Sequence, residues 1–124
     1  VVLTPGTASP FAPKAFRASA GSALRVPVAR GVLSTELVTW ARSSGASLAG
    51  ADAHLGDDPS TLRGVAPLVL AIGSEGHGLS APVVQALDRR VTIPLSPRVE
   101  SLNAAVATGI LLYALSPKTS AEKR

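Results

Sequence analysis

The feature that most constrains the fold is an apolar run at residues 67–72, followed at once by a glycine-rich loop. The run reads PLVLAI and has no alternation of polar and apolar residues, as expected of a strand covered by helices on both faces. The loop at residues 73–79 reads GSEGHGL, and residues 80–87 suit a helix with Ser80 as its N-cap. A strand, a glycine loop and a helix in this order indicate an α/β fold.

Short apolar runs and helix-like segments alternate along the rest of the chain. We predict further strands over residues 1–3, 24–29, 46–51 and 91–95, and further helices over residues 12–20, 34–43 and 102–115. Polar loops are expected at residues 54–64 and 96–101. The alternation favours a mostly parallel sheet with helices on both faces. The last helix is apolar nearly all round, which predicts that it lies in the interior or at a subunit interface.

The composition suits one folded domain. Hydrophobic residues make up 46% of the 124 residues and charged residues 16%, which argues against disorder. A net charge of +4 permits a polyanionic partner without requiring one. We expect no secretory signal, because the first residues lack a basic region followed by a long apolar run, and no membrane span, because the longest apolar stretch is too short.

Cysteine is absent, which excludes disulfides and thiolate zinc sites and fits a cytoplasmic location. The two histidines, His54 and His77, lack the spacing of metal ligands, so we expect no metal.

The glycine loop has the character of a ligand-binding loop. Its three glycines let the backbone approach a ligand, and it follows a strand at the place where open α/β sheets bind ligands. A tight turn without a ligand is the alternative. The spacing GxxGxG differs from the GxGxxG of dinucleotide-binding domains, and no Lys-Ser/Thr follows as in a phosphate loop. Glu75 would repel phosphate and suits a cationic or hydroxyl-bearing ligand, unless it is a solvated charge or an acceptor for backbone amides.

A second segment also runs from strand to loop to helix. Residues 93–95 read IPL, and residues 100–103 read ESLN before an alanine-rich helix. Ser101 could simply cap that helix, and Asn103 would lie in its first turn.

Together the two segments resemble the second and third motifs of the SpoU-type (TrmH-like) RNA 2′-O-ribose methyltransferases of the SPOUT class. In that family a strand ends in GxEGxGL, and a later strand gives IP, then SLN and an alanine-rich helix. The matching residues are Gly73, Glu75, Gly76, Gly78, Leu79, Ile93, Pro94, Ser101, Leu102 and Asn103. The segment SPFAPKAFRASAGSALRVPV continues the resemblance, which extends to about residue 116.

The resemblance implies a SPOUT fold with a deep C-terminal trefoil knot that holds S-adenosyl-L-methionine. The residues that would bind this cofactor are Gly73, Gly76, Ile93, Leu95 and Leu102. Glu75, Ser101 and Asn103 would form the polar, catalytic wall beside the methyl-transfer site. The family also implies a homodimer that methylates a ribose 2′-hydroxyl of rRNA or tRNA. Basic residues that could contact RNA phosphates are Lys14, Arg17, Arg25, Arg89, Arg90 and Arg98.

One family motif has no counterpart in the chain. Members carry an earlier NxGxxxRT segment whose Arg is implicated in activating the ribose hydroxyl, and Arg17 does not match it. We therefore interpret residues 1–116 as a partial methyltransferase domain, truncated rather than naturally lacking this motif, and residues 117–124 as a polar tail. The chain alone is then expected to be inactive. The rival hypotheses are a noncatalytic module for cofactor binding, RNA binding or dimerisation, and a nucleotide-binding domain, which the glycine spacing disfavours.

Overall fold

Two small parallel sheets organise the chain in the computed structural model, which describes residues 1–116. One sheet has the order β4-β3-β5 and the other pairs two strands. The strands are β1 (Val2–Leu3), β2 (Ala29–Arg30), β3 (Ser47–Ala51), β4 (Leu68–Ala71) and β5 (Arg89–Val91). Every strand pair is parallel, which confirms the predicted α/β class with parallel strands.

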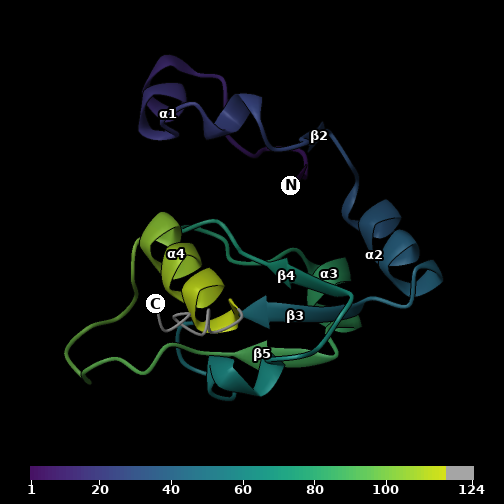
Figure 1. Cartoon of the computed structure of the whole chain (residues 1–124). Helices are drawn as coiled ribbons and strands as arrows, with labels where there is room; N and C mark the ends of the chain where they lie inside the picture. Colours follow the sequence, from purple (N-terminus) through teal and green to yellow (C-terminus); the bar gives the residue numbers. More distant parts are fainter. Residues whose placement is uncertain (117–124) are drawn as a thin grey trace, which may run out of the picture.

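Helices connect the strands (Figure 1). They are α1 (Pro13–Ala18), α2 (Ser34–Ser43), α3 (Ala81–Ala86) and α4 (Ala104–Leu115), with short 3-10 turns η1 (Ser22–Leu24) and η2 (Pro59–Leu62). Figure 1 shows the two-stranded sheet and α1 set apart from the three-stranded sheet, with α2 between them. No helix within residues 1–116 is long and apolar enough to cross a bilayer.

Neighbouring residues of β3 show that the three-stranded sheet is covered on both faces. Ala49 is 1% exposed and belongs to a core cluster with Leu62, Val91 and Leu111, so its face lies towards α4. A Cβ on the next residue, Gly50, would lie 2.7 Å from Leu87, which directly follows α3. Since successive side chains of a strand point to opposite faces, α4 and α3 cover opposite sides of the sheet. The small residues Ala49 and Gly50 let both layers approach closely.

The predicted elements at 34–43 and 67–72 are confirmed by α2 and β4, and Ser80 is the N-cap residue of α3. The polar loop predicted at 54–64 contains η2, whose Leu62 is 1% exposed. The residue after η2 holds the end of α4, because the Nε of Arg63 donates to the carbonyl oxygen of Ala114 at 2.9 Å. The polar tail expected at 117–124 lies outside the described residues.

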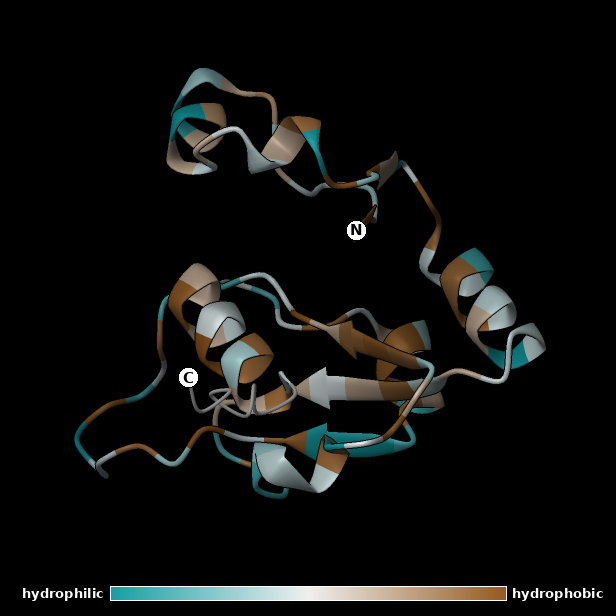
Figure 2. Ribbon diagram, in the orientation of Figure 1, coloured by the Kyte–Doolittle hydropathy of each residue, from teal (hydrophilic) through white to brown (hydrophobic). Residues whose placement is uncertain are grey.

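Two predicted strands are wrong in extent. Within residues 24–29 only Ala29 is in a strand, and Leu24 ends η1. The strand predicted at 91–95 is instead Arg89–Val91. It stops there because Thr92 donates its amide to the carbonyl oxygen of Asp57 in a neighbouring loop, at 3.0 Å, and Pro94 has no amide to donate. Figure 2 shows the contrast between the hydrophobic β4 and the hydrophilic start of β5.

The last helix, expected in the interior or at a subunit interface, is buried on one side only within this chain. Leu111 is 1% exposed, but Leu112 is 57% and Tyr113 84% exposed, because the sheet covers only one side of α4. The helix begins at Ala104 rather than Leu102. Asn103 is its N-cap, and its Oδ1 accepts the amides of Ala105 and Val106 at 2.9 and 3.3 Å.

Candidate functional site

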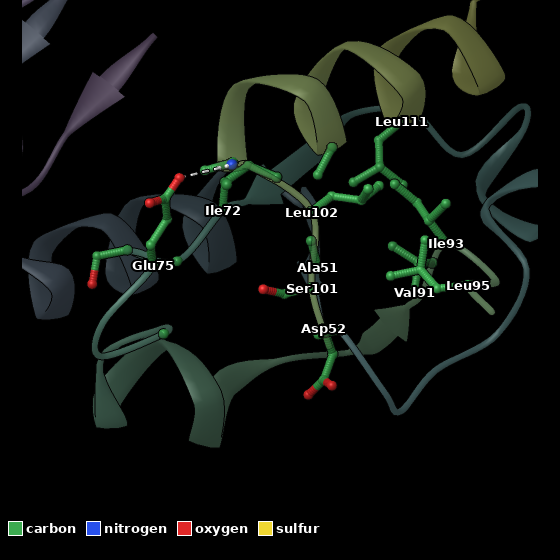
Figure 3. Close-up of a pocket in the computed structure, with 16 residues that line it drawn as sticks. Ala51, Asp52, Ile72, Glu75, Val91, Ile93, Leu95, Ser101, Leu102 and Leu111 are labelled. Atoms are coloured by element: carbon green, nitrogen blue, oxygen red, sulfur yellow. Dashed lines mark hydrogen bonds between the residues drawn. The ribbon is translucent and has the colours of Figure 1, made fainter. Parts of the chain in front are cut away.

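A pocket of about 230 Å³ opens where the three strands β3, β4 and β5 end, with α4 forming one side (Figure 3). The carboxyl ends of parallel strands are the usual ligand-binding edge of such a sheet. Each strand contributes the residues that follow it, and the loop before α4 closes the pocket. The lining residues are Ala51, Asp52, Ala53, Ile72, Gly73, Ser74, Glu75, Gly78, Val91, Ile93, Leu95, Ser101, Leu102, Ala104, Ala107 and Leu111.

Most of the residues singled out in the sequence meet in this pocket. Those in its wall are Gly73, Glu75, Ile93, Leu95, Ser101 and Leu102. Asn103 lies directly behind the wall, bonded to Glu75. Gly76 is not in the wall, and a Cβ added to it would meet no atom within 4 Å. The cofactor-binding and catalytic roles of these residues stay predictions.

The glycine loop is both a tight turn and a wall of the pocket. A Cβ on Gly73 would lie 2.4 Å from the carbonyl carbon of Gly78, a distance that no side chain can occupy. The amide of Gly78 donates to the carbonyl oxygen of Ser74 at 2.9 Å, and the reverse bond is 3.2 Å long. Gly78 has φ +66°, where glycine is favoured. The glycines therefore close the loop on itself, and this closure sets the shape of the wall.

Glu75 connects the two motifs, which are far apart in the sequence. Its Oε1 accepts the side-chain amide of Asn103 at 3.1 Å and the backbone amide of Ala104 at 3.3 Å. The bond to Ala104 is the dashed line in Figure 3. The contact with Ala104 fits the interpretation of Glu75 as an acceptor for backbone amides. Asn103 combines a donor and an acceptor, so one side chain caps α4 and orients the carboxylate. Ser101, which could have been the cap, lines the pocket instead.

Asp52 is the pocket residue that sequence reasoning missed. It directly follows β3 and lies in the wall. Its Oδ1 accepts the amides of His54 and Leu55, each at 2.9 Å, and its Oδ2 accepts Nη1 of Arg90 at 3.2 Å. The two backbone amides first, and then Arg90, hold the pKa of Asp52 below its usual value of 3.8. The signal for it in the sequence is an acidic residue directly after the strand predicted at 46–51, the place where open α/β sheets bind ligands.

The charges of the pocket suit a cationic or hydroxyl-bearing ligand. Both charged residues in its wall, Asp52 and Glu75, are acids, and the wall residues within the described chain include no Lys or Arg. Asp52 is paired with Arg90, so Glu75 is the carboxylate that would repel a phosphate. Within residues 1–116, no three His, Asp or Glu side chains come together as a metal site.

Comparisons with known proteins point to one family. The model of the SpoU rRNA Methylase family matches residues 1–113. An uncharacterized tRNA/rRNA methyltransferase of Mycobacterium bovis is 45% identical over 103 residues, which are 82% of this chain and 32% of that protein. A similar protein of Mycobacterium leprae is 47% identical over 100 residues, 79% of this chain and 32% of that protein. The chain thus spans about a third of the length of these relatives.

Solved structures with the same fold agree. The SpoU methyltransferase AviRb from Streptomyces viridochromogenes, in complex with AdoMet, matches with a TM-score of 0.80 and 33% identity, over 92% of this chain and 45% of that one. An AdoMet-bound rRNA methyltransferase from Sinorhizobium meliloti matches with a TM-score of 0.82 and 30% identity, over 92% and 44%. The parallel sheet, the two motifs that meet in its pocket, and the family match over residues 1–113 lead to one conclusion: this chain belongs to the SpoU RNA methyltransferase family.

Proposed function

We propose that the pocket binds S-adenosyl-L-methionine, and that the longer protein transfers its methyl group to a ribose 2′-hydroxyl of rRNA or tRNA in the cytoplasm. The observation that carries this proposal is that Glu75, from the first motif, and Asn103, from the second, are hydrogen-bonded beside one pocket. Two structures similar to this chain contain AdoMet.

The pocket residues fit this cofactor. Ile72, Ile93, Leu95 and Leu102 give an apolar surface for a purine ring, and the glycine loop brings backbone close to the ligand. The carboxylate of Glu75 suits a positively charged sulfonium or a ribose hydroxyl. When bound, the cofactor supplies an electrophilic methyl group on its sulfonium sulfur.

The chain's own polar residues would position the substrate. Asn103 fixes the carboxylate of Glu75, and Ser101 lies in the same wall. These groups can align a ribose hydroxyl with the methyl carbon, which lowers the barrier by removing orientational freedom. The hydroxyl must also lose its proton, and a positioned group that assists this contributes about 10²–10⁴ in rate.

A group that favours the ribose alkoxide is not found among the described wall residues, because none of them is Lys or Arg. We therefore propose that residues 1–116 are part of a methyltransferase domain, and that the chain alone binds cofactor without methylating RNA. A noncatalytic binding module is the alternative that this same observation favours.

We propose further that the longer protein has the trefoil knot of its family and forms a homodimer through α4. The outward face of α4 carries Val106, Leu112 and Tyr113, which are 52%, 57% and 84% exposed. A patch of large apolar side chains of this kind marks a protein interface. Gly109 on the same helix has open space beside it, so another backbone could approach closely.

The test combines binding with a product analysis. Titration calorimetry of the chain with S-adenosylhomocysteine is expected to give saturable binding. The full-length protein, incubated with labelled S-adenosyl-L-methionine and unmodified RNA, is expected to give label in alkali-resistant dinucleotides, because a 2′-O-methyl group blocks alkaline cleavage of the neighbouring phosphodiester.

Label in alkali-sensitive nucleotides would overturn the 2′-O assignment and indicate base methylation. Cofactor binding without RNA label in the full-length protein would favour the noncatalytic module. An RNA with 2′-deoxyribose at the labelled position is the control and is expected to take up no label there.

A further inference from the structure

Beyond the two family motifs, we propose that Asp52 and Arg90 form a clamp that positions residues 52–57 as a wall of the pocket and so sets its affinity for the ligand. This inference rests on the proposed function, because it assigns positioning residues to the same site. We call residues 52–57 the clamp loop.

The first end of the clamp loop is held by a single carboxylate. Asp52 accepts three hydrogen bonds, from the amides of His54 and Leu55 and from Nη1 of Arg90. Its own amide donates to the carbonyl oxygen of Val91 at 2.9 Å. The side chain and the backbone of Asp52 therefore both connect the loop to β5.

The second end is held to the same strand. Asp57 donates its amide to the carbonyl oxygen of Arg90 at 2.9 Å and accepts the amide of Thr92 at 3.0 Å. Between the two ends, Gly56 has φ +150°, and a Cβ there would lie 2.8 Å from the backbone of Arg90 and Val91. The loop thus lies directly against β5, and no side chain fits between them.

This attachment matters for the pocket because the clamp loop and β5 form adjacent parts of its wall. Asp52 and Ala53 line the pocket from the loop, and Val91, Ile93 and Leu95 line it from β5 and the residues that follow. If the loop moved away from β5, the pocket would widen between these two groups. In Figure 3 the carboxylate of Asp52 points away from Leu102 and Leu111. This orientation suits a residue that positions the wall of the pocket.

Asp52 is ionised at neutral pH, and the loop amides followed by Arg90 hold its pKa below the usual value. Its ion pair with Arg90 is partly open to solvent, with side-chain exposures of 28% and 42%. Such a pair contributes little stability by itself. Its main effect is on the geometry of the loop, because the same carboxylate also binds two loop amides.

The chain offers a matched control at the other end of β3. There Asp88 pairs with Nη1 of Arg42 at 2.7 Å and accepts the amide of Leu48 at 2.7 Å, and none of these three residues lines the pocket. Asp88 therefore binds an arginine and a backbone amide, as Asp52 does, but it does not position a wall of the pocket.

The experiment measures S-adenosylhomocysteine affinity by calorimetry, and the melting temperature, on the full chain. Asp52→Ala is expected to weaken binding by roughly 5- to 150-fold, the range for coupling between linked sites. Asp52→Asn is expected to recover part of the affinity, because the amide oxygen can still accept from His54 and Leu55. Asp88→Ala is expected to lower the melting temperature without changing affinity.

The outcomes separate this inference from the proposed function. If the wild-type chain binds but Asp52→Ala binds equally well, the clamp has no role in affinity and only this inference fails. Equal weakening by Asp88→Ala would show a general loss of stability and would also overturn it. If the wild-type chain does not bind at all, the proposed cofactor site fails first. Amide hydrogen exchange at His54 and Leu55, accelerated in Asp52→Ala but not in Asp88→Ala, is the expected result that needs no ligand.

Discussion

The two ends of β3 are held by similar groups with different consequences. At its amino end, Asp88 binds Arg42 of α2 and the amide of Leu48, and Arg42 also donates to the carbonyl oxygen of Ala86 in α3. At its carboxyl end, Asp52 binds Arg90 and two loop amides. The first set joins two helices to the sheet. The second joins a loop to a strand at the edge of a pocket.

An ion pair therefore does not by itself mark a functional site. Both aspartates have a lowered pKa, and in both cases the largest cause is a backbone amide: that of His54 for Asp52 and that of Leu48 for Asp88. What distinguishes them is the neighbouring cavity, which Asp52 lines and Asp88 does not. If the cavity is what matters, the carboxyl end of the sheet can be disturbed separately from the rest of the fold.

The largest expected effect comes from Leu111, which belongs to both the core cluster and the pocket wall. Leu111→Asp would bury an unpaired charge, and we expect it to cost about 4 kcal/mol or more in the free energy of unfolding. Urea denaturation followed by circular dichroism measures this. Leu112→Asp, at a 57% exposed position on the same helix, is the control and is expected to keep the fold. A native-like Leu111→Asp protein would mean that α4 is misplaced.

Gly73→Val is expected to disturb the carboxyl end of the sheet and to leave its amino end intact. The new side chain meets the backbone of Gly78, so the loop must shift, at a strain of about 1–3 kcal/mol. We expect S-adenosylhomocysteine binding to weaken by roughly 5- to 150-fold, measured by calorimetry.

The matching variant at the amino end is Gly45→Ala. Gly45 has φ +68° but open space beside it, so the change is expected to cost about 1 kcal/mol of stability and no affinity. Unchanged affinity in Gly73→Val would argue against the glycine loop as the ligand wall.

Two substitutions of Asn103 can distinguish its role as the N-cap of α4 from a role in catalysis. Asn103→Ala removes the N-cap of α4, which is expected to cost about 1 kcal/mol, and also the donor to Glu75. In the full-length enzyme we expect turnover to fall more than cofactor affinity. Asn103→Asp keeps an acceptor for the cap but places a second carboxylate against Glu75, so we expect stability to recover and turnover to stay low. Normal turnover in both variants would leave Asn103 with a capping role only.

The smallest expected effect is on acid stability. Both aspartates have a pKa below 3.8 in the folded chain. The stability they supply is therefore complete well above that pH and is lost as the pH falls through the lower, folded value. Melting temperatures measured on a falling pH series are expected to decline less steeply in Asp52→Asn and in Asp88→Asn than in the wild type. An unchanged decline in both variants would contradict the assigned hydrogen bonds.

The sequence predicted those elements whose formation depends on residues only a few positions apart. The apolar run at β4, the helix at α2 and the glycine turn after β4 follow from residue patterns within a few positions. The end of β5 and the exposure of α4 do not, because they depend on segments far away in the chain. Thr92 bonds to Asp57, and α4 packs against the core with only the side that carries Leu111.

Some residues of the candidate site could be predicted from the sequence, and one could not. Glu75, Ser101 and Leu102 were chosen through their resemblance to family motifs, and the structure brings them to one pocket. Asp52 was missed because its partner Arg90 is distant in the sequence and its other partners are backbone amides, which have no sequence signature.

The bond between Glu75 and the first amide of α4 has a thermodynamic consequence. A ligand that stabilises the glycine loop also stabilises the docking of α4, and such linkage is reciprocal. A partner on the exposed face of α4 that stabilises this same docking would then raise ligand affinity by the factor by which the ligand raises affinity for the partner. The carboxylate of Glu75 would in this way couple occupancy of the pocket to binding of a partner on α4.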